Sequence, residues 1–423
     1  MLLTDVFTPT DFPKLTYVER DQLHLEMLLG EWVRSSTQIA SISGPSKAGK
    51  TVLVQRVVGE GNLVTVSGAS VRTPDQLWER VLDWLGEPHA TMTSSIDTKT
   101  ETDSRERTAQ VGFSGTGATH KSGHLEAEAQ ADTLQATVNR RGLPQVVAEI
   151  ARSPTTVLLD DFHYIPAAIQ ADVAQQLKDA ASRGVRLCVA SVPHQADNVV
   201  RALPELRGRV MAIDIDYWSK RDLLQIPALG CKALNIDIDP ASLQVFATEA
   251  AGSPQLMQSI CLWTCSHYGV REPQETYRMI TLDETARKEV LFLTSVTADF
   301  RSLVRQLISG PRRERRNYVH FDGRTGDVYL TVMRAIALDP PRLTIDYGEL
   351  TRRLEELCKG ASPDGASVIG ACTRIKQIAV SKASSVGPAI DWDEDQQILA
   401  VNDPYLLFYL RWSVVLEREA DAL

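Results

Sequence analysis

The sequence feature that most constrains the fold of this chain is an octapeptide that fits the pattern G-x-x-x-x-G-K-[ST] in full. Its residues are Gly44, Pro45, Ser46, Lys47, Ala48, Gly49, Lys50 and Thr51. The alternating segment 38–43 before it predicts a strand, and segment 51–58 after it predicts a helix. In this context the pattern forms a loop whose backbone N–H groups and helix N-terminus bind phosphate. We therefore expect Lys50 to reach the β- and γ-phosphates of ATP or ADP, and Thr51 to hold Mg²⁺.

A phosphate loop of this kind needs a carboxylate that positions the metal, and the sequence supplies a candidate pair. The apolar segment 155–159 predicts a strand that ends in Asp160 and Asp161. We expect Asp160 to hold the magnesium through water and Asp161 to orient or deprotonate the attacking water. The alternative is an acidic turn at the end of a strand.

The period of the apolar residues switches repeatedly between strand and helix over the first half of the chain. Strands are predicted at 63–67, 155–159, 185–191 and 210–215, and helices at 17–33, 73–85, 167–181 and 197–206, with Thr73 as an N-cap. Strands that are apolar on both faces and alternate with helices indicate a parallel sheet covered on both sides. The fold class predicted is therefore α/β, a P-loop NTPase sheet flanked by helices.

The length of 423 residues predicts two or three domains. Residues 1–218 form the predicted ATPase core, with a Thr-, Ser- and Gly-rich insertion at 89–141 that is either flexible or a hairpin ordered on assembly. Residues 219–283 read as an all-helical lid and 284–326 as a connecting helix and basic loop. Residues 327–423 predict a winged-helix domain, with helices at 327–338, 346–357 and 365–381, a wing at 390–401 and an amphipathic segment at 405–416.

Composition narrows the class of protein. The chain is 43% hydrophobic and 23% charged, which is typical of soluble globular proteins, and its net charge of −9 disfavours a polyanion as the default partner. The N-terminus shows no signal-peptide pattern and no run of 18 apolar residues occurs, so we expect a cytoplasmic protein. Cys261 and Cys265 could share a helical face but lack further ligands for zinc, so reduced thiols are expected.

With these motifs, the sequence resembles AAA+ P-loop ATPases of the STAND and origin-recognition branch. The resemblance implies that Tyr17 and Arg20 lie beside the adenine, with Glu19 where glycine is usual, and that Ser191 senses the γ-phosphate. Arg207 or Arg209 would reach a neighbouring subunit's nucleotide, the alternative being solvated arginines. Gly252, Ser253 and Pro254 resemble the lid signature of STAND ATPases, with Gln255 where a basic residue is common.

Two functions follow from the resemblance. One is a STAND-like signalling switch that self-assembles on ATP binding and acts on a partner or effector protein, in prokaryotic antiviral or conflict defence. The other is a DNA-binding ATPase of the replication-initiation or transposition-regulator type. The wing is acidic, with Asp391, Asp393, Glu394 and Asp395, so nucleic acid is not favoured. A membrane is expected as a partner only if the insertion rearranges. His163 is interpreted as a structural histidine or as a link between the metal site and a subunit interface.

Overall fold

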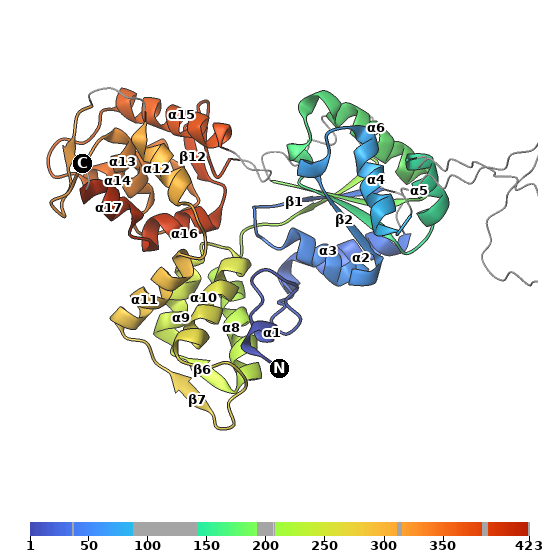
Figure 1. Cartoon of the computed structure of the whole chain (residues 1–423), viewed down its shortest axis with the longest axis horizontal. Coiled ribbons are helices and arrows are strands. Elements are labelled where there is room, and N and C mark those ends of the chain that lie inside the picture. The colour runs from blue at the N-terminus through green and yellow to red at the C-terminus, as the bar shows by residue number, and fades with distance from the viewer. Residues whose placement is uncertain are drawn as a thin grey trace, which may run out of the picture.

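The structure is a computed structural model (Figure 1) that describes residues 1–35, 38–87, 142–192, 206, 208–310, 315–382 and 388–421. A five-stranded parallel sheet, in the order β2-β3-β4-β1-β5, forms the centre of the first domain. Its strands are β1 (Ile39–Ser43), β2 (Leu63–Ser67), β3 (Thr156–Asp160), β4 (Arg186–Ser191) and β5 (Val210–Asp214). Because the strands run parallel, their carboxyl ends meet at one edge of the sheet, and the loops that follow them lie there.

Helices cover both faces of this sheet, which confirms the α/β prediction. On one face α2 (Leu25–Ser35) and α3 (Lys50–Val58) pack around Ile42 and Leu158. On the other face α4 (Pro74–Trp84), α5 (Leu143–Ile150) and α6 (Ala167–Ser182) pack around Val157 and Leu159. Successive strand residues point to opposite faces, so apolar runs require both covers.

Some local details differ from the predictions. The helix expected from Tyr17 begins only at Leu25, after a 3₁₀ turn at Asp21–Leu23. Helix α5 was not expected, because it directly follows the polar insertion. Thr73 precedes α4 as expected, but its side chain makes no capping hydrogen bond. The insertion at 89–141 and all of the expected helix 197–206 except Leu206 lie outside the described residues.

The lid contains α8 (Lys220–Leu234), α9 (Pro240–Glu249) and α10 (Pro254–His267) around one apolar core. Helix α11 (Glu284–Ser295), which the sequence assigned to the connecting segment 284–326, packs into the same core. The helices of the expected lid are present, and β6 (Ile236–Ile238) and β7 (Arg278–Ile280) add a small parallel sheet that the sequence did not indicate. Helix α1 (Leu3–Val6) and Phe7 also pack into this core. The first residues of the chain, which the sequence placed with the ATPase core, therefore contact the lid.

The winged-helix domain consists of three helices and an antiparallel sheet in the order β10-β12-β11. The helices are α13 (Val328–Ile336), α14 (Tyr347–Leu357) and α15 (Gly365–Ser381), and the strands are β10 (Thr344–Asp346), β11 (Ile390–Asp393) and β12 (Ile398–Val401). The flanking elements are α12 (Arg301–Ser309), β8 (Tyr318–Val319), β9 (Thr325–Gly326), α16 (Pro404–Trp412) and α17 (Val415–Asp421). The expected helices and wing are present, and β10 adds a third strand to the wing sheet.

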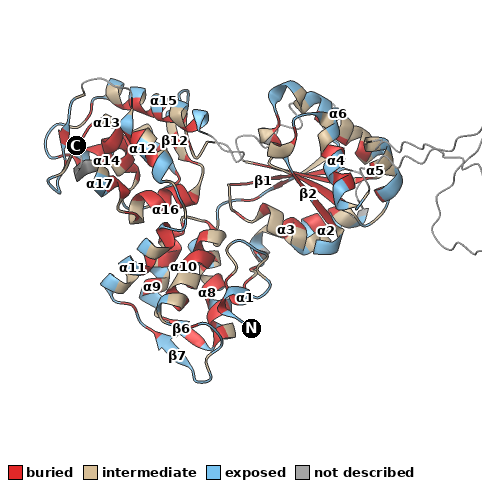
Figure 2. Cartoon of the chain, in the orientation of Figure 1, coloured by how far each residue is buried: buried red, intermediate tan, exposed pale blue. Residues whose placement is uncertain are grey.

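Helix α16 joins the lid to the winged-helix domain, and we call these two parts together the C-terminal unit. The expected amphipathic pattern is wrong, because every residue from Pro404 to Leu410 is buried. Tyr405 and Phe408 lie in the lid core, whereas Leu406 and Leu410 lie in the winged-helix core. Figure 2 shows the buried helix between the two parts. A helix covered by two cores is apolar all round.

Within the ranges that the structure describes, no helix is both long enough and apolar enough to cross a membrane.

Candidate functional site

The phosphate loop leaves β1 at Ser43 and enters α3 at Lys50, as the sequence predicts. Two backbone features shape it. Gly44 lies so close to Ile215 that a Cβ atom would approach the Ile215 carbonyl oxygen to 2.8 Å, and Gly49 has a φ of +95°. Only glycine accepts both conditions without strain. Lys47 also has a positive φ, of +61°, which is uncommon for a residue with a side chain.

The Lys50 side chain is buried inside its own loop. Its ammonium group donates hydrogen bonds of 2.9 Å to the carbonyl oxygens of both Gly44 and Pro45. Burial lowers the pKa of Lys50, and the nearby carboxylates of Asp160 and Asp161 oppose that shift. The ammonium is thus held where the loop surrounds the space for a phosphate, on contacts that it can exchange for phosphate oxygens.

The acidic pair meets this loop at the carboxyl edge of the sheet. The Thr51 hydroxyl donates a hydrogen bond of 2.7 Å to Asp160 Oδ2. Mg²⁺ in phosphate sites takes oxygen ligands, commonly one or two carboxylates besides the phosphates. The hydroxyl and carboxylate in contact are therefore the donor set that would hold Mg²⁺, which would neutralise phosphate charge when bound.

Asp161 follows in the left-handed conformation, with a φ of +57° and a ψ of +49°. Its pKa is raised to about 6, chiefly by burial and also by the Asp160 carboxylate, while Lys50 opposes the shift. A carboxyl group in such an environment has the character of a general base that works near neutral pH. The two aspartates, adjacent in sequence, thus lie in different surroundings.

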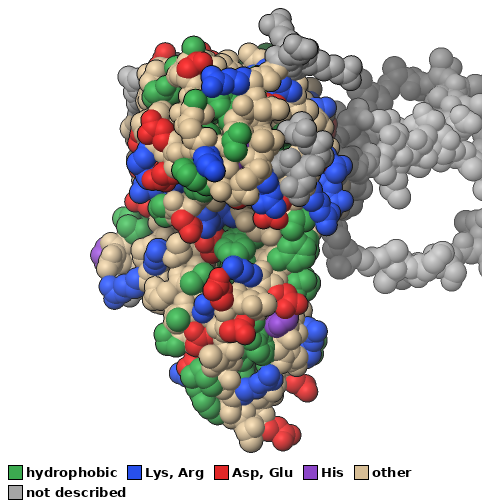
Figure 3. Space-filling model, turned by 90° about the vertical axis from the view of Figure 1, so that its left-hand side faces the viewer, with side chains coloured by type: hydrophobic (Ala, Val, Ile, Leu, Met, Phe, Trp, Pro, Cys, Tyr) green, Lys and Arg blue, Asp and Glu red, His purple; other side chains and the backbone are tan. Residues whose placement is uncertain are grey.

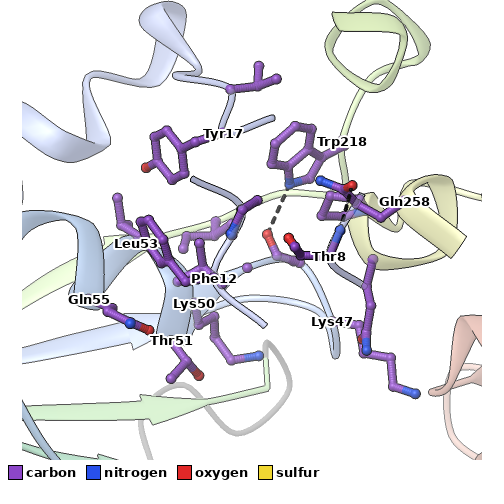
Figure 4. Close-up of a pocket in the computed structure, with 18 of the residues that line it drawn as sticks. Thr8, Phe12, Tyr17, Lys47, Lys50, Thr51, Leu53, Gln55, Trp218 and Gln258 are labelled. Carbon is purple, nitrogen blue, oxygen red and sulfur yellow. Dashed lines mark hydrogen bonds between the residues drawn. The ribbon is translucent and has the colours of Figure 1, made fainter. Parts of the chain in front are cut away.

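A cavity of about 500 Å³ extends from the phosphate loop toward the lid. Figure 4 shows its walls, with Tyr17 and Trp218 on one side of the loop and Lys50 and Thr51 on the other. The predicted residues Tyr17, Arg20 and Pro254 all line it. The Tyr17 ring stacks on Phe12 at 6.1 Å between centroids, and its hydroxyl donates a 2.6 Å hydrogen bond to Glu26. Flat aromatic surface beside a phosphate loop is suited to a nucleotide base.

Sequence reasoning missed several residues of this cavity. The Trp218 indole N–H donates a 2.9 Å hydrogen bond to the Ala48 carbonyl, and Arg20 lies over the same indole ring at 5.2 Å. Arg20 also donates to the Asp216 carbonyl at 2.9 Å. The Gln258 amide of α10 accepts a 3.3 Å bond from the Thr8 N–H. No local motif marks these residues, because they reach the cavity from the N-terminal segment, the linker after β5 and the lid.

The remaining predicted residues are placed as follows. Ser191 ends β4 beside the loop, its carbonyl accepts a 3.2 Å bond from Gly44 N–H, and its buried hydroxyl has no hydrogen-bond partner within the described part of the chain. Arg209 is exposed and directly precedes β5, at the sheet edge opposite to the phosphate loop, so it does not line the cavity. Arg207 lies outside the described residues. His163 lies in the 3₁₀ turn Phe162–Tyr164, directly after Asp161.

The turn before Pro254 has a clear structural basis. Gly252 has a φ of +80°, and a Cβ atom at this position would lie 3.0 Å from the Cβ of Tyr217. Its carbonyl accepts a 3.2 Å bond from the Trp218 N–H, and Ser253 caps α10. This turn therefore fixes the linker, the lid and one wall of the cavity to one another.

Comparisons with known proteins bear on the fold. No family model matches the sequence, and no curated protein matches it. The Walker-type ATPase of Pyrococcus abyssi is similar in structure, with a TM-score of 0.50 and 12% identity over 93% of this chain and 96% of that one. The ORC2 protein of Aeropyrum pernix gives a TM-score of 0.48 at 12% identity, over 99% and 97% of the two chains. Cdc6p of Pyrobaculum aerophilum gives 0.43 at 14%, over 99% and 98%.

The first of these similarities extends over nearly the full length of both chains and agrees with the geometry described above. The chain therefore has the fold of a Walker-type ATPase, a P-loop NTPase sheet flanked by helices, followed by a helical lid and a C-terminal winged-helix domain.

Proposed function

We propose that this chain binds ATP with Mg²⁺ and hydrolyses it, and that it works as a STAND-like signalling switch. The observation that carries the proposal is the convergence of Lys50, Thr51, Asp160 and Asp161 at one end of a cavity with aromatic walls. Phosphoryl transfer needs backbone N–H groups that bind the phosphates, a cationic side chain and a carboxylate that binds the metal.

Each residue has a distinct part in this proposal. The loop N–H groups and Lys50 bind the phosphates, and Thr51 and Asp160 hold the metal. Asp161 orients the attacking water and accepts its proton. The buried Ser191 hydroxyl lacks a partner among the described residues and lies next to Gly44, where it would contact the γ-phosphate. Arg209 lies on the opposite edge of the sheet, so any part it has in hydrolysis is at the site of a second copy.

The switch we propose rests on motion between the ATPase core and the C-terminal unit. The chain would close around ADP, and ATP would favour an open form that self-assembles and acts on a partner or effector protein. A ligand shifts such an equilibrium only by its difference in affinity for the two forms. The biological role that we propose is antiviral or other conflict signalling in a prokaryote.

The winged-helix domain supports a protein partner better than DNA. Lys376 of α15 donates to the Trp392 carbonyl at 2.9 Å and pairs with Asp391 at 3.2 Å, so the acidic wing already binds a cation of that helix. Of the basic loop, Arg315 pairs with Asp327 at 2.6 Å, and Arg316 lies over the Tyr318 ring. These contacts leave less positive charge for phosphates. Tight, steeply salt-dependent binding to duplex DNA would instead support the DNA-binding alternative.

Two substitutions test the proposed function. Lys50→Ala is expected to abolish ATP binding, measured by titration with a fluorescent ATP analogue. Asp161→Ala is expected to bind ATP, to lose turnover and to accumulate the assembled form, measured by phosphate release and by light scattering with ATP against ADP. Normal turnover by Asp161→Ala would contradict the role of this carboxylate, and equal particle size with both nucleotides would contradict the switch.

A further inference from the structure

One charged contact connects the phosphate loop to the C-terminal unit. The Lys47 ammonium lies 3.2 Å from Asp403 Oδ1 and 4.3 Å from the centre of the Tyr405 ring. Both side chains are largely covered, with 26% of Lys47 and 20% of Asp403 exposed. Figure 4 shows Lys47 leaving the loop on the side away from Thr51, and Figure 3 shows the outer surface of the C-terminal unit, where acidic and basic side chains are interspersed. The loop that would bind phosphates is thus joined to the first turn of α16.

The residue that makes this contact, Lys47, has an unfavourable backbone conformation. Lys47 holds a φ of +61° in this loop. A residue with a side chain disfavours that conformation relative to glycine. A glycine would fit the loop better, so the side chain at this position contributes something that the loop backbone alone does not require. In this structure its ammonium contacts Asp403 and Tyr405.

Asp403 and Tyr405 connect that ammonium to both parts of the C-terminal unit. Asp403 caps α16 by accepting a 2.9 Å bond from the Tyr405 N–H. The Tyr405 hydroxyl lies 2.7 Å from the Ser259 hydroxyl of α10 and also donates to the Gln255 carbonyl at 3.3 Å. A displacement of the Lys47 side chain would therefore affect contacts of both the lid and the winged-helix domain.

The charge of Asp403 matters because of where it lies. Burial raises the pKa of Tyr164, and the carboxylates of Asp161, Asp160 and Asp403 raise it further. One phenol thus experiences all three carboxylates, which places Asp403 at the same end of the site as the acidic pair. A carboxylate at the rim of an anion-binding loop repels phosphate unless a cation neutralises it. Lys47 is the cation in contact with it.

We propose that Asp403 is a specificity-determining residue of the nucleotide site, which disfavours triphosphate while the C-terminal unit is docked on the phosphate loop. Lys47 holds Asp403 in place when the loop carries little negative charge. A triphosphate brings more charge than a diphosphate, so it attracts the Lys47 ammonium and repels the Asp403 carboxylate more strongly. The γ-phosphate therefore separates the C-terminal unit from the loop, and the docked unit favours ADP. This inference rests on the proposed function.

The central variant is Asp403→Asn. Asparagine also caps helices well, so α16 keeps its first turn while the charge is lost. We expect this variant to bind a non-hydrolysable ATP analogue about 3- to 10-fold more tightly than the unchanged protein, and to bind ADP within about 2-fold. The matched control is Asp391→Asn, which removes the charge from another Lys–Asp pair of 3.2 Å, away from the cavity. The control should leave both affinities unchanged.

A second measurement follows the separation itself. Dyes on Gln175→Cys of α6 and Glu355→Cys of α14, both exposed positions, report the distance between core and C-terminal unit. The six native cysteines are buried, so they compete little for the dye. The ATP analogue should lengthen the distance in the unchanged protein, and ADP should not. Lys47→Met, which removes the cation instead, should lengthen it without nucleotide.

The outcomes separate this inference from the proposed function. If the unchanged protein binds no nucleotide, the proposed function fails. If it binds nucleotide but Asp403→Asn shows unchanged or weaker affinity for the ATP analogue, the inference is overturned while the nucleotide site stands. An unchanged dye distance in Lys47→Met would likewise overturn it, even if Asp403→Asn does not fold.

Discussion

Helices begin differently in the ATPase core and in the C-terminal unit. In the C-terminal unit, eight helices start after a residue whose side chain accepts a capping hydrogen bond from the backbone, and α12 starts without one. The eight capping residues are Ser219, Asp239, Ser253, Asp283, Asp327, Asp346, Asp364 and Asp403. In the core, the residues before α3, α4, α5 and α6 make no such bond. An uncapped helix start leaves backbone N–H groups available to an anion. At α3 these N–H groups belong to the phosphate loop, where a bound anion could accept hydrogen bonds from them.

The same contrast appears at the two joints of the molecule. The lid and the winged-helix domain share α16 and a buried ion pair, in which Arg411 donates to Glu249 at 2.7 and 2.8 Å. The C-terminal unit meets the phosphate loop through the polar contact of Lys47 with Asp403, and the linker before the lid meets it through the hydrogen bond from Trp218 to Ala48. Polar contacts at a surface contribute little net stability. Motion is therefore expected between core and C-terminal unit, with the C-terminal unit moving as one body.

The largest expected effect tests this rigidity. Arg411→Ala leaves the buried carboxylate of Glu249 without its cation, although the Trp412 indole still donates to it at 2.6 Å. An unpaired buried charge costs about 3–5 kcal/mol, so urea unfolding followed by circular dichroism should show that loss. Lys47→Ala, the comparison at the other joint, should cost under about 1 kcal/mol. Equal losses would remove the distinction between the two joints.

A smaller effect is expected at the core, where a close backbone contact positions Asp161. A Cβ atom on Gly68 would lie 3.0 Å from the Asp161 carbonyl carbon and closer still to its oxygen. Gly68→Ala should therefore displace Asp161 and slow ATP hydrolysis by about 10-fold or more. The affinity for ATP should stay within about 2-fold, because Lys50 and Thr51 lie on another loop.

The control for this variant is Gly61→Ala. Gly61 comes just before the same strand, β2, and a Cβ atom at this position would meet no atom within 4 Å beyond its chain neighbours. Hydrolysis should be unchanged in the control. If Gly68→Ala lowers affinity and turnover by the same factor, Gly68 supports the whole site and not the position of Asp161.

Much of the fold was predictable because local patterns dominate it. The strand limits 63–67 are those of β2, and the helix limits 365–381 are those of α15, since apolar period and capping residues agree there. The predictions were wrong where tertiary contacts decide. Helix α16 looked amphipathic, but two cores cover it, and α1 packs on the lid from the far end of the chain.

The candidate site divides in the same way. Local motifs predicted Lys50 and Thr51 in the phosphate loop and Asp160 at the end of an apolar strand. The structure brings Thr51 and Asp160 into contact, with Lys50 beside them. Thr8, Trp218 and Gln258 carry no such spacing, because they come from segments that meet only in the folded chain. No motif marks the contact of Asp403 with Lys47, because it joins residues from distant parts of the sequence.

The smallest expected effect is a loss of stability at low pH that is confined to the C-terminal unit. The winged-helix domain buries His320, whose ring contacts the Thr331 hydroxyl at 3.1 Å and the guanidinium of Arg334, which also pairs with Asp322. The pKa of His320 is lowered to about 4, chiefly by burial and also by the Arg334 charge, while Asp322 opposes the shift. The unfolded chain, with an ordinary histidine pKa of about 6.5, then binds a proton that the folded domain does not.

The contribution of His320 to the free energy of unfolding is therefore fully present above about pH 6.5, and it is lost as the pH drops toward about 4. Between pH 6.5 and 5.5 the expected loss is about 1 kcal/mol in the free energy of unfolding of the C-terminal unit. The urea midpoint of each region can be measured across this pH range by hydrogen exchange. The midpoint of the C-terminal unit should fall as the pH is lowered. His320→Gln should flatten that slope, whereas the same change at His267, an exposed histidine of the lid, should leave it intact. A slope that survives His320→Gln would place the acid sensitivity on other groups, and the buried histidine would then not distinguish the two regions.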